Sequence, residues 1–168
     1  MRIVIDTNVV VSAIVFGGQP WKLIKCLTNS DLDAYASIQI VEEYKSTLLR
    51  LLKKYPEKEI HTTMEEFEKY IHVLPSHSHI EACRDPDDNK FIECAIDNRC
   101  IYIVSGDKDL LVLEQYEDIG ILTVSEFLEQ YEKNRHKNST KNWQSTFFSY
   151  HFDKKSDKSK QKNHFARI

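Results

Sequence analysis

The sequence lacks any apolar stretch of 18 residues, the length that a helix needs to cross a membrane. It also lacks the pattern of a secretory leader, because a strand-like segment stands where a charged and then apolar segment would be needed. No internal repeat is present. These absences argue against a membrane-spanning protein and a repeat architecture, and we expect a chain without a secretion signal.

Cysteine is scarce, and its spacing indicates neither a redox pair nor a zinc site. No CxxC motif occurs, and histidine partners at a zinc-binding spacing are absent. His72, His77 and His79 stand near one another in a predicted loop, but no second group of ligands lies at a motif spacing. We therefore expect reduced, mostly buried thiols in a cytoplasmic protein. The cysteines are Cys26, Cys83, Cys94 and Cys100.

Charge is distributed unevenly along the 168 residues, a length that supports one ordinary domain. Residues 133–168 contain ten Lys or Arg and two Asp, whereas residues 1–132 contain thirteen basic and twenty-four acidic residues. Apolar periodicity is also lost from about residue 134. We predict a domain over 1–132 and a basic, flexible tail over 133–168, which could either contact nucleic acid or only keep the protein in solution.

Strands and helices alternate in the pattern of apolar residues. Strands are predicted at 3–5, 33–36, 73–74, 101–104 and 121–124. Helices are predicted at 9–16, 21–27, 38–54 with Ser37 as its cap, 57–71, from Asp87 or Asp88 past Ala95, and from a cap at Ser125 onward. This order predicts a three-layer α/β/α sandwich with a mostly parallel central sheet.

Acidic side chains fall where the predicted strands end. Asp6 directly follows the first strand, and Asp107 follows the fourth by three residues. Asp88 opens the helix before that fourth strand, and Glu42 and Glu43 lie early in the helix after the second. In open α/β sheets the binding crevice lies beyond the carboxyl ends of the strands, so these acids are expected to converge there. Adjacent helical residues point about 100° apart, so only one of the two glutamates can face the crevice well.

Several carboxylates in one crevice repel one another unless a cation lies among them. Oxygen ligands without His or Cys favour Mg²⁺ or Mn²⁺. Such a cluster can hold one or two metal ions, activate water and stabilise the leaving oxygen of a phosphodiester. The pattern therefore indicates a site that cuts nucleic acid.

Each acid also has a purely structural interpretation. Asp6, Asp88 and Asp107 can each cap a helix or occupy a turn, and Glu43 can lie on a solvated helix face. Only the position that these acids share in the predicted topology favours the functional interpretation over the structural one.

Four blocks of sequence, in order along the chain, resemble the PIN domain family, in the bacterial branch grouped with type II toxin–antitoxin toxins. They are I-V-I-D-T-N at 3–8, S-I-Q-I-V-E-E-Y at 37–44, D-P-D-D-N-K-F-I-E-C-A at 85–95 and V-S-G-D-K-D-L-L at 104–111. The resemblance spans almost all of 1–132. It implies a fold similar to that of 5′-nucleases and RNase H, and a metal-dependent endoribonuclease.

The resemblance also implies the members of the site. Glu43, rather than Glu42, matches the family's helix acid because it directly precedes a tyrosine, and Asp88, rather than Asp87, matches because an alanine follows seven residues on. The four acids expected to hold Mg²⁺ or Mn²⁺ and to carry catalysis are Asp6, Glu43, Asp88 and Asp107. The residues expected to support them are Thr7, Asn8, Ser105 and Asp109.

The resemblance further implies an RNA substrate, a small antitoxin as partner and a homo-oligomer, and the lack of a long apolar run predicts no membrane contact. An alternative function is a non-cleaving RNA-binding or scaffold module whose acids are structural. A phosphohydrolase with Asp6 as nucleophile is disfavoured, because it needs a second acid two residues on and Asn8 stands there.

Overall fold

The computed structural model describes residues 1–136, so the rest of the predicted tail lies outside the described residues. The chain divides into two units, Met1–Leu128 and Glu129–Ile168. The predicted boundary after residue 132 and the predicted tail stay predictions. All the acids predicted for the site lie in the first unit, which is built around one sheet.

The sheet has six strands in the order β3-β2-β1-β4-β6-β5, and only β5 is antiparallel to its neighbour. This mostly parallel sheet with helices packed against it confirms the predicted α/β sandwich. The strands are β1 (Arg2–Ile5), β2 (Asp33–Ala36), β3 (Ile71–Val73), β4 (Tyr102–Val104), β5 (Gln115–Tyr116) and β6 (Ile119–Leu122).

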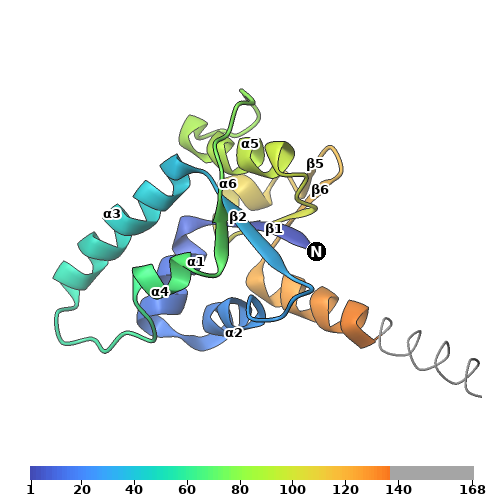
Figure 1. Ribbon diagram of the computed structural model, residues 1–168. Coiled ribbons are helices and arrows are strands. Elements are labelled where there is room, and N and C mark those ends of the chain that lie inside the picture. The colour runs from blue at the N-terminus through green and yellow to red at the C-terminus, as the bar shows by residue number, and fades with distance from the viewer. Residues whose placement is uncertain (137–168) are drawn as a thin grey trace, which may run out of the picture. The chain divides into compact units, whose positions relative to one another are not determined.

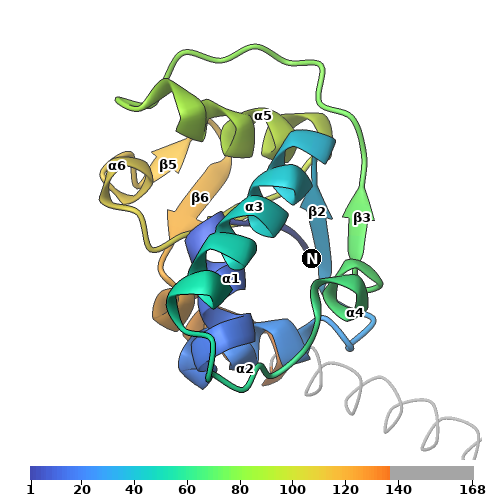
Figure 2. The same cartoon turned by 90° about the vertical axis from the view of Figure 1, so that its left-hand side faces the viewer.

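Helices cover the sheet, with α5 packed against β1, β2 and β4 and with α1 packed against α2 and α3. Both ribbon views place α5 above the strands and α2 below them (Figures 1 and 2). The helices are α1 (Thr7–Phe16), α2 (Gly18–Cys26), α3 (Ile38–Lys54), α4 (Met64–Glu68), the 3₁₀ turn η1 (Pro86–Asp88), α5 (Asn89–Asp97) and α6 (Lys108–Leu111). Residues 124–136 are also helical.

The order of strands changes direction between β1 and β4. From β1 the chain adds β2 and then β3 on one side, and it returns to place β4 on the other side. Ile5 is paired in register with Val104, so the residues that follow these two strands are neighbours. Ligands of open α/β sheets bind at such a switch point, beyond the carboxyl ends of the strands.

The helix predicted over 57–71 is wrong at both ends, because only Met64–Glu68 is helical and Ile71 begins β3. The backbone N–H of His61 donates to Ile14 O of α1 (2.8 Å), and the His61 ring stacks on Trp21 with ring centroids 5.5 Å apart. A Cβ on Gly17 would lie 2.4 Å from His61 Nε2, so glycine is needed where this ring packs. These tertiary contacts outweigh the helical periodicity of the segment.

Other boundaries differ from the predictions by less. Thr123, rather than Ser125, caps the helix over 124–136, since its Oγ1 accepts from the N–H of Glu126 (3.3 Å) while Glu126 accepts from the N–H of Thr123 (2.9 Å). Cys94 and Cys100 are buried, whereas Cys26 and Cys83 are half-buried, and no disulfide joins any two of them. Across residues 1–136, no helix has the length and apolar character needed to cross a bilayer.

Candidate functional site

Asp6 is a buried carboxylate at the switch point of the sheet. Three buried residues of β1 hold it there, and its N–H donates to Val104 O of β4 (2.9 Å). Its Oδ1 accepts from the N–H of Asn8 (3.3 Å), so it also caps α1. Burial raises its pKa above the ordinary value, and the charge of Asp107 raises it further, although bonds from Ser105, Asn8 and Gly106 lower it.

Ser105 joins the ends of β1 and β4 through one hydroxyl group. Its Oγ donates to Asp6 Oδ2 (2.6 Å) and accepts from the N–H of Asp107 (2.9 Å). Because Ser105 is itself buried, the hydroxyl proton is directed at Asp6 and the position of Asp107 is fixed relative to it. Asp107 in turn caps α6 by accepting from the N–H of Asp109 (2.7 Å). Two of the predicted acids are therefore linked through the predicted support residue.

Asp88 reaches the same region from the turn before α5. Asp85, not Asp88, accepts the capping bond of this turn, from the N–H of Asp87 (3.0 Å). The Asp88 side chain makes no capping bond, so the structural interpretation of this residue as a cap fails. Burial, with the charges of Asp107, Asp85 and Asp6, raises the Asp88 pKa to about 6. The neighbouring Asp87 is exposed.

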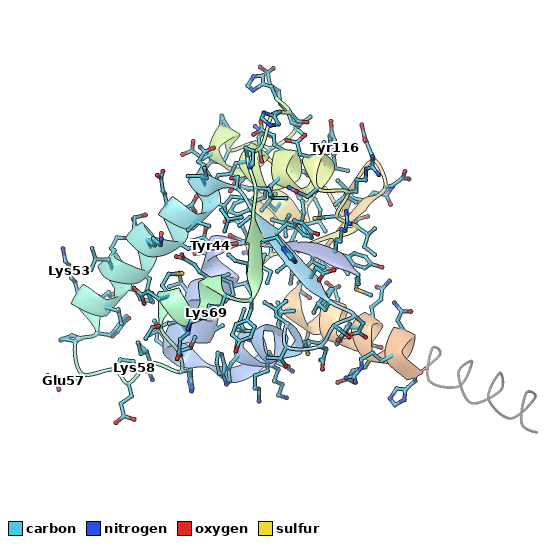
Figure 3. All side chains as sticks on the ribbon, viewed as in Figure 1. Tyr44, Lys53, Glu57, Lys58, Lys69 and Tyr116 are labelled. Carbon is cyan, nitrogen blue, oxygen red and sulfur yellow. The ribbon has the colours of Figure 1, made fainter. Side chains whose placement is uncertain are left out.

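Glu43 enters the site on α3, which is fastened to the end of β1 by Tyr44. The hydroxyl of this buried tyrosine, labelled in Figure 3, donates to Ile5 O, the carbonyl directly before Asp6. Glu43 Oε2 pairs with Lys90 Nζ of α5 (2.6 Å), and Lys90 also donates to Asp87 O (2.5 Å). The adjacent Glu42 is exposed.

The structure therefore brings three of the four predicted acids into electrostatic contact and gives the fourth a cationic partner. The charge of Asp107 raises the pKa of Asp6, and the charges of Asp107 and Asp6 raise the pKa of Asp88, whereas Glu43 pairs with Lys90. Within residues 1–136, no three His, Cys, Asp or Glu side chains stand close enough to hold a metal ion without rearranging. The donor set still fits a hard divalent cation, since it consists of carboxylates whose mutual repulsion such an ion relieves.

The four supporting residues have different surroundings. Thr7 directly follows Asp6 in the sequence, and its Oγ1 is buried and has no hydrogen-bond partner among the described residues. Asn8 is exposed at the start of α1. Asp109 pairs with the exposed Arg84 (2.5 Å), which places a guanidinium next to the acids. The histidines of the predicted loop do not gather: the His77 backbone binds Asp97, whereas His79 lies near Glu93.

Asn89 and Lys90 are part of the site's framework, and the sequence interpretation assigned neither of them a role. Buried Asn89 accepts from the N–H groups of Ala82 (3.0 Å) and Cys83 (2.9 Å) and donates to Pro86 O (3.1 Å). It thereby ties the long segment before η1, which arches over α5 in Figure 2, to the turn that carries Asp88. The signal available in the sequence was the polar pair Asn89-Lys90, which directly follows Asp87 and Asp88.

Asn89→Ala is expected to lower the free energy of unfolding by about 2–3 kcal/mol, because it leaves two N–H groups without an acceptor. The midpoint of urea unfolding measures this, and amide exchange at Ala82 and Cys83 should accelerate. Glu93→Gln is the matched control, since Glu93 accepts from the Ile80 N–H (3.0 Å) and Gln keeps an acceptor there. An Asn89→Ala midpoint equal to that of the control would contradict this role.

The chain is similar to known proteins in two respects. The model of the PIN domain family matches residues 2–109, which include all four acids. An uncharacterized protein of Methanocaldococcus jannaschii, MJ1680, is 33% identical over 145 residues, covering 79% of this chain and 93% of that protein.

Proposed function

Because the chain belongs to the PIN domain family, whose members are generally metal-dependent nucleases, we propose that it is a ribonuclease that uses Mg²⁺ or Mn²⁺ to hydrolyse RNA phosphodiesters. The observation that carries the proposal is the buried link from Asp6 through Ser105 to Asp107 at the switch point of the sheet. Building such a charged group into a hydrophobic sheet is costly unless a cation or substrate uses it.

Asp6, Asp88, Asp107 and Glu43 would hold the metal, directly or through water. A divalent ion bound there supplies activation of water and stabilisation of negative charge on the phosphodiester. Ser105 holds the Asp6 carboxylate by donating to Oδ2, and Oδ1, which accepts from the Asn8 N–H (3.3 Å), keeps a second lone pair for a ligand. Lys90 holds the Glu43 side chain in place through an ion pair on the α3 side of the site.

Arg84 is an exposed cation beside these acids and is proposed to meet the RNA. Its guanidinium pairs with Asp109 and is also influenced by the charges of Asp107 and Asp85, which raise the Arg84 pKa further. Arginine forms two parallel bonds to a phosphate, so it suits the backbone of a bound strand.

A non-cleaving scaffold is the second candidate, favoured by one observation: Asp6 and Asp107 both accept capping bonds. Roles as the toxin of a type II pair, as a homo-oligomer and as the partner of a small antitoxin are proposals that only the sequence resemblance supports, and a cytoplasmic location stays a prediction.

Saturating Mn²⁺ is expected to raise the melting temperature of the full chain by about 5–10 °C. At a hundred times the dissociation constant, binding contributes about 2.7 kcal/mol, and each kcal/mol corresponds to roughly 2–4 °C at this size. Differential scanning fluorimetry with and without excess EDTA measures the shift, and Ca²⁺ and Mg²⁺ test the choice of ion. Asp107→Asn should lose most of the shift. A melting temperature that Mn²⁺ does not move would favour the scaffold instead.

A further inference from the structure

A groove between α1 and α3 leads away from the carboxylates. It encloses about 390 Å³, and its walls include Asn8, Ser12 and Phe16 of α1 and Thr47, Arg50 and Lys54 of α3. The three α1 residues are spaced four apart, so they follow one face of the helix over about 12 Å. One end of the groove is Asn8, whose N–H donates to Asp6, and the other end is Phe16.

The groove becomes basic with distance from the acids. Helix α3 carries Glu42 and Glu43 near its start, but from Lys45 to Lys54 it contains four basic residues and no acid. Arg50 donates to Thr47 Oγ1 (3.3 Å), and among the described residues neither Arg50 nor Lys54 has a carboxylate partner. The basic stretch from Lys45 to Lys54 is a local exception, because residues 1–132 as a whole contain nearly twice as many acidic as basic residues.

Exposed aromatic rings stand at the basic end. Phe16 is 49% exposed and Tyr55 is 40% exposed, and the two rings meet edge to face with centroids 5.9 Å apart. Lys58 Nζ lies 5.6 Å from the centre of the Phe16 ring, and Lys54 Nζ lies 5.4 Å from that of Tyr55. Figure 3 shows Lys53 and Lys58 at this same end of α3, together with the acidic Glu57.

We propose that this groove guides a single-stranded RNA from the carboxylates toward Phe16, with Arg50 and Lys54 contacting phosphates and Phe16 stacking on a base. The inference rests on the proposed ribonuclease function. Cations that follow the backbone, together with an exposed ring, are the two elements by which proteins bind single strands without reading their sequence. A double helix offers no free base face to Phe16, so the strand must be single at this point.

Binding is tested on the full chain in EDTA, where a metal-dependent enzyme cannot cut, with a fluorescein-labelled single-stranded RNA and fluorescence anisotropy over a series of KCl concentrations. Arg50→Gln and Lys54→Gln should each weaken binding and reduce the slope of log affinity against log salt by about 0.7, the value for one phosphate contact on a single strand. Phe16→Ala should weaken binding about tenfold, and Phe16→Tyr should restore it.

Lys53→Gln is the matched control, because it removes the same charge one residue away from Lys54 but does not line the groove. It should keep the affinity and the salt slope of the wild type. The proposal is overturned if Lys53→Gln and Lys54→Gln weaken RNA binding equally. It is also overturned if the Arg50, Lys54 and Phe16 variants all bind RNA as tightly as the wild type, and the groove would then be a candidate site for a protein segment instead. Thermal melts of each variant exclude a folding defect.

The same variants separate this inference from the proposed function. If the wild type cuts RNA with Mn²⁺ while the groove variants bind RNA normally, the path alone is refuted. If RNA binding depends on the groove but no metal-dependent cleavage occurs, the ribonuclease function is refuted and the groove remains a binding site.

Discussion

Asp6→Asn and Asp107→Asn are each expected to lower the rate of Mn²⁺-dependent RNA cleavage by at least about a hundredfold. Charge stabilisation by a bound cation is worth several kcal/mol, and each 1.36 kcal/mol is a factor of ten in rate. The oxygen of the amide that replaces Asp6 can still accept from the Asn8 N–H, and its NH2 group can donate to Ser105 Oγ in place of the bond that Asp6 Oδ2 accepts, so the fold should persist. Single-turnover cleavage of a labelled RNA measures the effect, and the melting temperature without metal checks the fold.

The two adjacent glutamates of α3 provide a matched pair for this experiment. Glu43 is half-buried and faces Lys90, whereas Glu42 is exposed. Glu43→Gln should slow cleavage, and Glu42→Gln should leave it unchanged. If cleavage survives Asp6→Asn and Asp107→Asn undiminished, the acids are not the catalytic centre, and a reversed order of the two glutamate variants would exchange their roles.

Mn²⁺ affinity is expected to fall at least about tenfold between pH 7 and pH 5. The Asp88 pKa is about 6 in the folded chain because of burial and the nearby acids, and the Asp6 pKa is raised as well. Below about pH 6 the ion must displace the proton of Asp88, and one displaced proton weakens binding tenfold per pH unit. Calorimetry in buffers of different ionisation enthalpy should detect about one proton released per bound ion near pH 5.5, and fewer at pH 7.5.

The metal-free protein should respond to pH in the opposite direction. The Asp88 pKa is higher in the folded chain than the ordinary 3.8, so the folded state holds this proton more tightly than the unfolded state. The resulting stability is fully present below about pH 4 and is lost as the pH rises through about 6. Asp88→Asn should remove this dependence and part of the proton release. Mn²⁺ affinity that stays constant from pH 5 to 7.5 would show that neither acid binds the ion.

The sequence predicted an element correctly where its capping residue and its apolar periodicity indicate the same bounds. The strand over Asp33–Ala36 and the helix capped by Ser37 were predicted with the bounds that the structure has. The segment over 57–71 was not, because the contact of His61 with α1 depends on residues distant in sequence. The short strand β5 was missed because two residues carry no detectable periodicity.

The candidate site divides in a similar way. The ends of strands could be located from the sequence, and the topology then placed Asp6 beside Ser105 and Asp107. The pairing of Glu43 with Lys90 joins two helices, so no spacing within one segment reveals it. The same holds for Asn89, whose partners belong to a loop without regular structure.

The placement of β4 in the middle of the sheet also determines at what stage of protein synthesis the site can assemble. Asp6 is made first, but its neighbour Asp107 lies 101 residues later, after the chain has added two strands, β2 and β3, on the other side of β1. At about 5–20 residues per second, a ribosome needs roughly 5–20 seconds to travel from one acid to the other. During that interval the growing chain holds an incomplete set of carboxylates. In the proposed ribonuclease, the full set of acids therefore cannot assemble until Asp107 has been made.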